Sequence, residues 1–258
     1  MAQRFQAKTI LITGAGSGIG QATSVAFGQE GAVVIGIDRS QGGLAATQRL
    51  VEATGARFEG FTADVSSVAS VDSAFELANE VTGQIDYAFN NAGITQSSTL
   101  AADISPAEWD DVMRINVTGV WLCMRRELQL MQKQGHGAIV NTASFLSTHS
   151  MEMQTAYVAS KHAVLGMTKN TAIEYAAQSI RVNAVAPGGI PTGMMAASLS
   201  GLEKEAQDEA RQAIGDMHPM KRLGRPEEIA DAVMFLCSEQ AGFITGACLS
   251  VDGGWAAL

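Results

Sequence analysis

Tyr157 and Lys161 stand four residues apart in a stretch with helical spacing of its apolar residues, so both side chains project from one face of the predicted helix. A free tyrosine has a pKa of about 10 and is a poor base at neutral pH. Lowering that pKa to about 7 takes roughly 4 kcal/mol of preferential stabilisation of the phenolate. A lysine ammonium in a partly dehydrated site supplies stabilisation of this kind. Because many helices carry such a pair by chance, the rest of the sequence decides whether it is an acid/base pair.

A glycine-rich turn near the N-terminus predicts a nucleotide site. The first apolar run leads directly into residues 13–20, which include Gly14, Gly18 and Gly20, and a helical pattern follows. Glycines let the backbone approach a pyrophosphate, and a helix N-terminus offers free N–H groups and the positive end of its dipole. The strict G-x-G-x-x-G spacing is not met, because residue 19 is Ile. The strand before the turn and the helix after it nevertheless favour a dinucleotide loop over a structural turn.

Asp38 ends the second apolar run, 18 residues after Gly20. A carboxylate at that place accepts hydrogen bonds from both adenosine ribose hydroxyls and repels a 2′-phosphate. Arg39 complicates this interpretation, because a guanidinium attracts such a phosphate. Asp38 is nearer the strand end, however, and residue 17 is Ser rather than a second cation. The sequence therefore predicts NAD in preference to NADP as the cofactor, together with a bound positively charged nicotinamide that would help Lys161 to stabilise the Tyr157 phenolate.

The elements that position these residues alternate along the whole chain. Short apolar runs that are rich in β-formers predict strands at Lys8–Thr13, Ala32–Asp38, Arg57–Thr62, Ile85–Asn90, Gly137–Ser144, Ile180–Ala186 and Cys248–Val251. Amphipathic stretches predict helices at Ile19–Gln29, Gly42–Thr54, Ser67–Thr82, Pro106–Gln134, Gln154–Ala177 and Pro226–Ser238. Strands that are apolar on both faces and alternate with helices predict a parallel sheet covered on two sides, an α/β fold. No linker or composition break divides residues 1–258, so we expect one domain.

One segment breaks this rhythm. Residues 188–217 are too long for an ordinary connection, and long insertions in compact domains are usually functional. Within them, Leu202–Ile214 has helical spacing of apolar residues and a charged opposite face. We expect this segment to form a mobile helical lid over the substrate.

Composition excludes several classes of function. A chain of 258 residues buries roughly three quarters of its unfolded surface without disulfides or metals, and its formal net charge of −9 argues against nucleic acid or an anionic membrane as partner. Three cysteines with irregular spacing indicate reduced thiols, and four histidines without ligand spacing predict no metal site. We expect a cytoplasmic protein, because the N-terminus has no apolar signal-like run and the chain has no run of about 18 apolar residues.

The order of these features resembles the short-chain dehydrogenase/reductase family over the whole chain. Besides the turn at 13–20, the matching segments are Asp64-Val65, Asn90-Asn91-Ala92-Gly93, Asn116, Ser144 at 13 residues before Tyr157, Arg181-Val182-Asn183, the segment 187–192 and Asp252-Gly253-Gly254. The resemblance implies a single-domain Rossmann-type, doubly wound sheet of about seven parallel strands. It also implies a catalytic tetrad of Asn116, Ser144, Tyr157 and Lys161.

In that tetrad, Tyr157 is expected to be the general acid/base on the substrate oxygen, which Ser144 also hydrogen-bonds. Lys161 is expected to tune Tyr157 and to contact the nicotinamide ribose, and Asn116 to hold a water that relays protons. Ala143 departs from many relatives, which carry a second serine there. The resemblance further implies a cofactor contact set made of Gly14, Ser17, Gly18, Ile19, Gly20, Asp38, Arg39, Asp64, Val65, Asn91, Ala92, Gly93, Tyr157, Lys161, Pro187, Gly188, Ile190 and Thr192.

Clues to the substrate lie beside the tetrad and at the start of the lid. The expected pocket wall consists of Phe145, His149, Met151, Met153, Met194 and Met195. Methionine is apolar and adaptable, which favours an apolar, cyclic or bulky secondary alcohol or its ketone; alternatively, these methionines fill the core. The segments at 88–92, 122–124 and 139–144 resemble relatives that oxidise cyclic diols and other alicyclic alcohols.

Three functions remain open. The first is an NAD(H)-dependent oxidoreductase that interconverts a secondary alcohol and its ketone. The second is a 3-oxoacyl-carrier-protein-type reductase that uses NADPH, which the lack of a strong basic cluster disfavours. The third is a catalytically silent nucleotide-binding scaffold, a class expected to lack one or more of the tetrad residues, all of which are present here.

We also expect a homotetramer. The helical stretches 106–134 and 154–177 present apolar and small residues on more than one face, among them Val117, Val120, Ala163, Val164 and Met167. By resemblance these helices pair across a dimer interface, and the C-terminal strand region completes the tetramer.

Overall fold

The computed structural model describes residues 3–258 and is built around a parallel sheet of seven strands. The strands are β1 (Thr9–Thr13), β2 (Val33–Asp38), β3 (Phe58–Thr62), β4 (Tyr87–Asn90), β5 (Gly137–Thr142), β6 (Ile180–Pro187) and β7 (Cys248–Val251). Their order in the sheet is β3-β2-β1-β4-β5-β6-β7. Every predicted strand is confirmed within two residues at each end. The inner strands are apolar on both faces and buried between helices, whereas the edge strands β3 and β7 are only partly buried.

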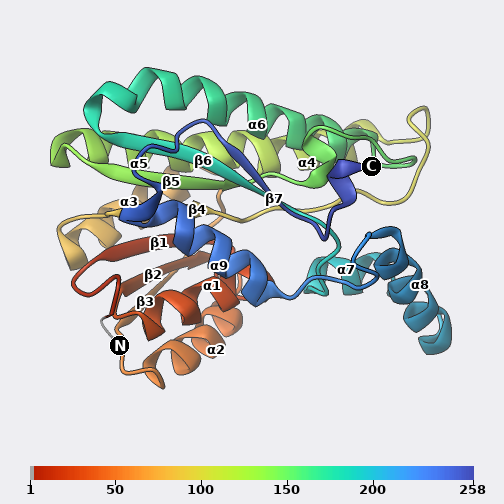
Figure 1. The fold of residues 1–258 in the computed structure, drawn as a ribbon, viewed down its shortest axis with the longest axis horizontal. Helices are drawn as coiled ribbons and strands as arrows, with labels where there is room; N and C mark the ends of the chain where they lie inside the picture. The colour runs from red at the N-terminus through yellow and green to blue at the C-terminus, as the bar shows by residue number, and fades with distance from the viewer. Residues whose placement is uncertain (1–2) are drawn as a thin grey trace.

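Helices cover both faces of the sheet (Figure 1). One layer contains α1 (Gly18–Gln29), α2 (Gln41–Glu52) and α9 (Pro226–Cys237). The other contains α3 (Val68–Thr82), α4 (Pro106–Met113), α5 (Val120–Gln134) and α6 (Thr155–Tyr175). The strand order reverses between β1 and β4, and in such sheets the crevice outside the carboxyl ends at the reversal is where ligands bind.

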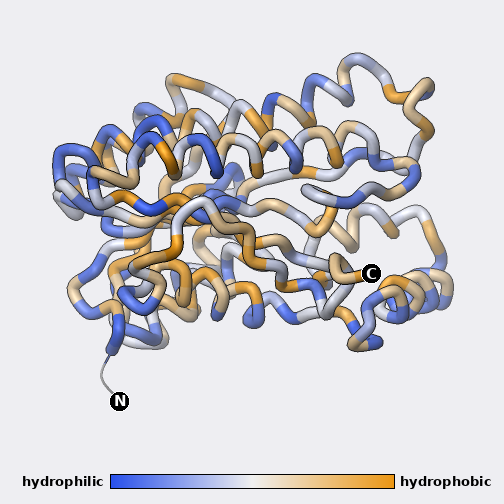
Figure 2. The backbone as a smooth tube through the Cα atoms, turned by 45° about the horizontal axis from the view of Figure 1, so that its top comes forward, coloured by the Kyte–Doolittle hydropathy of each residue, from blue (hydrophilic) through white to orange (hydrophobic). Residues whose placement is uncertain are grey.

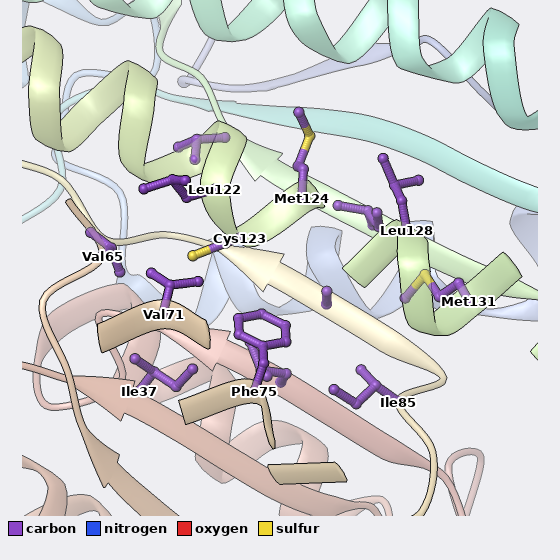
Figure 3. Packing of buried hydrophobic residues seen from close by; sticks show 14 of the residues in the cluster. Ile37, Val65, Val71, Phe75, Ile85, Leu122, Cys123, Met124, Leu128 and Met131 are labelled. Carbon is purple, nitrogen blue, oxygen red and sulfur yellow. The ribbon is translucent and has the colours of Figure 1, made fainter. Parts of the chain in front are cut away.

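Two apolar clusters hold these layers together. Between the sheet and α3 and α5, Phe75 packs with Ile37, Ile85, Leu128 and Met131 (Figure 3). On the opposite face, a second cluster includes Phe27 of α1, Val51 of α2 and Ile229 of α9. Figure 2 shows hydrophobic positions gathered along the central strands and hydrophilic ones on outer helical turns. The sheet is therefore fixed from both sides, so the ends of its strands are a rigid platform.

The predicted helix over 106–134 is wrong in one respect. It consists of α4, a π-helical segment at Arg114–Gly119 and then α5. A π-helical turn contains an extra residue, and such turns often occur at functional sites. Asn116 lies within this turn.

The predicted lid contains two helices rather than one. After β6, α7 spans Gly193–Ser198 and α8 spans Lys204–Met217, so the helix predicted from Leu202 begins two residues later. The two helices stand away from the sheet in Figure 1, and only Leu199 and Gly215 are buried among residues 193–217. Within the described residues, no helix combines the length and the apolar character needed to cross a bilayer.

Candidate active site

The four predicted catalytic residues come from three neighbouring segments. Tyr157 and Lys161 lie on α6, Asn116 lies in the π-helical turn, and Ser144 follows β5 by two residues. Ser144 is the N-cap of a short 3₁₀ helix over Phe145–Ser147: its hydroxyl accepts the Leu146 N–H at 3.2 Å, and its own N–H donates to the Ser147 hydroxyl at 3.0 Å. Ser144 also lowers the pKa of the Tyr157 phenol. The structure thus brings the predicted residues together.

Lys161 is fixed beside Tyr157. Its side chain is 4% exposed, and its Nζ donates to the carbonyl oxygen of Thr142, the last residue of β5, at 2.8 Å. Nζ lies 5.5 Å from the centroid of the Tyr157 ring. Burial lowers the pKa of Lys161 to about 8, because removal from water disfavours the ammonium form. The amine therefore titrates closer to neutral pH than a surface lysine.

The expected low pKa of Tyr157 is not a property of the protein alone. Burial raises the pKa of this phenol to about 12, and the hydrogen bond with Ser144 acts in the opposite direction. Reaching about 7 from there takes about 7 kcal/mol rather than the roughly 4 kcal/mol counted from a free tyrosine. The lysine and the bound nicotinamide would therefore have to stabilise the phenolate by more than the amount counted from a free tyrosine.

Asn116 is fully buried and bound at both ends of its amide. Its Oδ1 accepts the Ile94 N–H, and its Nδ2 donates to the Ile94 carbonyl oxygen, both at 2.8 Å. Nδ2 also donates to the Ser160 hydroxyl at 3.1 Å, which in turn donates to the Tyr157 carbonyl oxygen at 2.7 Å. Asn116 therefore links the chain after β4 to the helical turn that carries Tyr157.

Gln96 is a site residue that the sequence did not reveal. It is 3% exposed, and its Oε1 accepts the backbone N–H groups of Ala156 at 2.6 Å and Tyr157 at 3.0 Å. Its Nε2 donates to the Met153 carbonyl oxygen at 2.9 Å. Gln96 thus caps the first turn of α6. Gln154, which stands at the usual N-cap position, makes no such hydrogen bond with its side chain. No local signal indicates this role, because the partners are about sixty residues apart in the sequence.

The glycine turn has the shape that a pyrophosphate requires. Gly14 has φ +66°, which favours glycine, and a Cβ on Gly20 would collide with the Gly14 carbonyl oxygen. Ser17 is the N-cap of α1 but its side chain does not cap the helix, and the first turn has no acidic residue. The first N–H groups of α1 therefore remain available to an anion.

Asp38, the last residue of β2, lies beside this turn. Its Oδ2 accepts the Gly16 N–H at 2.9 Å and its Oδ1 accepts the Ser40 N–H at 2.8 Å. Both bonds hold the carboxylate at the carboxyl end of β2, beside the loop. The neighbouring Arg39 is exposed, and its charge acts on another carboxylate, since it contributes to the lowered pKa of Asp64.

Further predicted cofactor contacts surround the glycine turn. Asn91 donates from Nδ2 to the carbonyl oxygens of Thr13 at 3.2 Å and Gly14 at 3.3 Å. Thr192 lies against Gly18, where its Cγ2 would be 3.1 Å from an added Cβ. Val65 is buried after β3, whereas Asp64 is exposed, and hydrogen bonds from Ser66 lower the Asp64 pKa. The structure thus gathers loops that follow β1, β2, β3, β4 and β6.

The base of the predicted lid is tied down by His218. Its Nε2 accepts the Gly189 N–H at 2.9 Å, and its Nδ1 lies 2.8 Å from the Ile214 carbonyl oxygen. The ring also meets Trp255 edge-on, with centroids 4.6 Å apart. Trp255 in turn stacks on Phe145, the residue after Ser144, at 4.0 Å between centroids. One aromatic contact series therefore joins the end of β5, the C-terminus and the loop at 188–190.

The expected substrate-wall residues differ in exposure. Phe145 is 8% exposed and covered by Trp255. Met151, Met153 and Met194 are 36%, 42% and 37% exposed, so these three methionines do not fill the core. His149 and Met195 are half-buried. Among residues 3–258, no group of three or more His, Cys, Asp or Glu side chains is arranged to hold a metal ion.

Comparison with known proteins identifies the family. Residues 14–256 match the family model described as enoyl-(acyl carrier protein) reductase. The chain is 40% identical to levodione reductase of Leifsonia aquatica, covering 98% of this chain and 96% of that one. It is 37% identical both to the 3-oxoacyl-[acyl-carrier-protein] reductase of Thermotoga maritima, over 97% and 98% of the two chains, and to cyclohexanol dehydrogenase of Acinetobacter sp. strain SE19, over 99% and 97%.

Solved structures agree with this similarity. A crystal structure of levodione reductase superposes with a TM-score of 0.96 at 39% identity, covering 98% of this chain and 99% of that one. NAD⁺-bound xylitol dehydrogenase superposes with a TM-score of 0.91 at 31% identity, covering 97% and 100%. With this likeness over the whole fold and the Tyr157–Lys161 pair in place on α6, the chain belongs to the short-chain dehydrogenase/reductase family and is an oxidoreductase of that family.

Proposed function

We propose that this protein interconverts a secondary alcohol and its ketone with NAD(H), and that Tyr157 is the general acid/base. The single observation that carries the proposal is the position of the buried Lys161, whose amine the Thr142 carbonyl oxygen holds 5.5 Å from the Tyr157 ring; Ser144 also lowers the pKa of that phenol. A hydroxyl donor and a cation beside a phenol are what proton transfer at an alcohol oxygen needs. The scaffold alternative has no support of this kind.

In the proposed reaction, the protein handles the proton and the dinucleotide supplies the hydride chemistry. The Tyr157 phenolate accepts the proton of the alcohol during oxidation and returns it to the ketone oxygen during reduction. Ser144 donates a hydrogen bond to the same oxygen and so stabilises the charge that develops there. Lys161 favours the phenolate through its charge, and the Thr142 carbonyl oxygen fixes the position of its amine. Asn116 would hold a proton-relaying water.

The residues around the glycine turn fit a dinucleotide. The uncapped N-terminus of α1 suits a pyrophosphate. The Asp38 carboxylate, held by the Gly16 and Ser40 N–H groups, suits the adenosine ribose hydroxyls and opposes a 2′-phosphate by charge repulsion. Asp64 and Val65 would flank the adenine, Asn91 to Gly93 would form the floor, and Pro187, Gly188, Ile190 and Thr192 would hold the nicotinamide end. The NAD⁺-bound state of a structural relative supports the choice of NAD.

We propose an apolar, cyclic or bulky substrate. Exposed methionines at 151, 153 and 194 support an adaptable apolar wall, and the relative that is a cyclohexanol dehydrogenase supports an alicyclic alcohol. Residues 188–217 would close over that substrate as a lid within the single domain, because α7 and α8 bury little surface against the sheet. His218 would be the fixed point from which this segment moves.

A second candidate is a 3-oxoacyl-carrier-protein reductase that uses NADPH. The 37% identity to the Thermotoga maritima reductase favours it. A site for NADPH calls for a cation near the 2′-phosphate, whereas this chain has the anionic Asp38 where we expect the adenosine ribose. Turnover of a 3-oxoacyl thioester with NADPH, faster than that of any alicyclic ketone with NADH, would select this candidate.

We also propose a homotetramer. Large apolar side chains are exposed on the helices expected to pair, with Trp121 of α5 49% exposed and Ile173 of α6 81% exposed. Phe243, just before β7, is fully exposed as well. Exposed apolar groups on the very elements that are expected to pair support this assembly.

The decisive experiment follows NADH formation with a panel of cyclic and acyclic secondary alcohols. We expect turnover with cyclic members, and loss of about 10³-fold or more in kcat for Tyr157→Phe. The cofactor Kd of that variant, measured by NADH fluorescence, should stay within about threefold of wild type. A Tyr157→Phe variant that keeps most of its activity would refute the assignment of the acid/base.

A further inference from the structure

A second group of polar side chains is buried beneath the active-site platform. Glu127 of α5, Asn90 at the end of β4, Asn141 of β5 and Thr168 of α6 are each at most 1% exposed. Asn90 Nδ2 donates to Glu127 Oε2 and to Asn141 Oδ1, both at 3.0 Å. Asn141 Nδ2 donates to the Thr168 hydroxyl at 2.9 Å. These four side chains thus connect two strand ends with two helices.

Two atoms in this cluster have no hydrogen-bond partner within the described residues: Glu127 Oε1 and Asn90 Oδ1. They belong to the two side chains that are already joined through Glu127 Oε2 and Asn90 Nδ2. Both atoms are acceptors as long as the carboxyl is ionised, so they cannot bond each other. A proton on Oε1 turns it into a donor. In the cyclic pair that a carboxylic acid and a primary amide form, that one proton would be donated to Asn90 Oδ1 and would satisfy both atoms.

We propose that Glu127 is a positioning residue, held as a neutral carboxylic acid that pairs through both oxygens with the amide of Asn90 and so fixes the ends of β4 and β5. Leaving a buried polar atom unpaired is costly, and leaving a buried charge unpaired is more so. The direction of the Glu127 pKa agrees with this: burial raises it to about 8, against a lowering effect of the Asn90 hydrogen bond.

Ionisable groups on the elements packed around Glu127 do not supply a counter-charge. On α5 itself, Cys123 lies one turn away and is buried among the residues of Figure 3; burial, with the Glu127 charge as a smaller cause, raises its thiol pKa well above the usual range. The bases of α5 bind acids of α3, as Arg125 pairs with Asp72 and Arg126 with Asp72 and Glu76. Three further cations on neighbouring segments are bound elsewhere, namely Lys161 to the Thr142 carbonyl, Arg114 to Asp64 and Asp111, and Arg181 to carbonyls of residues 236–238. Lys133 of α5 and Lys169 of α6 are exposed on the outer sides of their helices.

The cluster reaches the active site through the residue that follows each of the two asparagines. Asn91 follows Asn90, and its side chain donates to the carbonyl oxygens of Thr13 and Gly14 in the glycine turn. Thr142 follows Asn141, and its carbonyl oxygen accepts the Lys161 ammonium. Fixing the side chains of Asn90 and Asn141 therefore fixes the backbone from which both of these contacts are made.

Ionisation of Glu127 reverses this effect. Loss of the proton places an uncompensated charge in the core and removes the bond to Asn90 Oδ1. The strand ends then loosen, so we expect weaker dinucleotide binding at alkaline pH. This last step depends on the proposed function, whereas the protonation of Glu127 does not.

The first test uses the cofactor-free protein and Glu127→Gln. A glutamine amide donates to Asn90 Oδ1 and accepts from Asn90 Nδ2 at every pH, so it reproduces the pair without a titrating group. The folded-state pKa of Glu127 lies above its ordinary 4.5, so its contribution to stability is present at low pH and is lost as pH rises towards 8. We measure the free energy of unfolding in urea between pH 5.5 and 7.5. Its slope against pH in wild type should differ from that in the variant by the equivalent of about one proton.

A matched control removes an exposed carboxylate from the neighbouring helix. Glu174 of α6 is exposed and, among residues 3–258, its side chain bonds only to Asn170, so Glu174→Gln should leave the wild-type slope unchanged. Equal slopes in wild type and Glu127→Gln would show that Glu127 is ionised in the folded protein and would overturn the proposal. If Glu127→Gln does not fold, the infrared carbonyl stretch of a buried protonated carboxylic acid decides in wild type: the proposal requires the band at pH 6 and its loss above pH 8 or so.

The second test measures the Kd for NADH from pH 6.5 to 9. Wild type should bind about threefold or more weakly at pH 9 than at pH 7, and Glu127→Gln should remove most of that change. Identical pH dependence in the two proteins would refute the positioning role even where the unfolding slopes differ. Failure of both proteins to bind NADH would instead refute the proposed function, because the unfolding slopes do not depend on the ligand.

Discussion

Gln96 holds the backbone of Tyr157 from outside its helix: the side-chain oxygen accepts the Tyr157 N–H at 3.0 Å and the Ala156 N–H at 2.6 Å. The first turn of a helix has unsatisfied N–H groups, and a side chain from the loop after β4 satisfies two of them here. The direction in which Tyr157 leaves α6 therefore depends on a residue that does not belong to α6.

Replacing Gln96 with Met should lower kcat more than it affects cofactor binding. Loss of the cap costs about 1 kcal/mol of stability, and misplacement of the phenol should lower kcat by about tenfold or more. Gln154→Met is the matched control, because Gln154 stands at the N-cap of α6 and its side chain makes no cap hydrogen bond to that helix. Steady-state kinetics and NADH titration check this. Equal kcat in Gln96→Met and wild type would contradict it.

Titration of the Tyr157 phenol should depend on the cofactor. In the cofactor-free protein, burial keeps the phenol protonated, with its pKa at about 12. With NAD⁺ bound, a positive charge joins Lys161 beside the phenol, and both charges favour the phenolate. The difference in tyrosinate absorbance between wild type and Tyr157→Phe should therefore appear at markedly lower pH with NAD⁺ than without it.

Lys161→Met should remove much of this downward shift, since the variant keeps a side chain of similar length without the charge. The same pH titration in that variant measures the effect. A phenolate that forms near pH 7 without any cofactor would contradict the expected dependence on NAD⁺.

The sequence predicts the seven strands because they are apolar on both faces and alternate with helices. It also predicts that Tyr157 and Lys161 project from one face of a helix and that a glycine turn precedes α1, since both features depend on residues close together in the chain. Gln96, Ser160 and Glu127 are not predictable in this way, because their roles arise only when distant segments pack. The burial that raises the Tyr157 pKa is not predictable from the neighbouring residues either, because it comes from the surrounding fold.

Cofactor selectivity should depend on the charge of Asp38. Asp38→Asn keeps an oxygen that can accept the Gly16 N–H but loses the negative charge that opposes a 2′-phosphate. We expect kcat/KM with NAD to fall by about tenfold and kcat/KM with NADP to rise. Arg39→Ala is the control and should lower only the NADP value. Parallel kinetics with both cofactors test this; a wild-type enzyme tenfold better with NADP would reverse the assignment.

The proposed tetramer should depend on the exposed face of α6. Ile173 is 81% exposed, and Ile173→Glu would place a charge in the proposed interface between chains, which is costly when desolvated. Light scattering should give the mass of four chains for wild type and a smaller assembly for the variant. Leu50→Glu changes a 48% exposed residue of α2 and should leave the mass unchanged. A monomeric wild type would refute the tetramer.

The extra residue in the π-helical turn at Arg114–Gly119 sets how α4 is rotated relative to α5. Removing one residue there would restore an ordinary α-helix, and the residues before it would rotate by about 100° relative to those after it. Asn116 would then lose its register with the Ile94 backbone while Glu127 kept its own against Asn90. A chain shortened by one residue at this point would keep a continuous helix and a packed interior, yet the asparagine would face a different direction from the one the site requires.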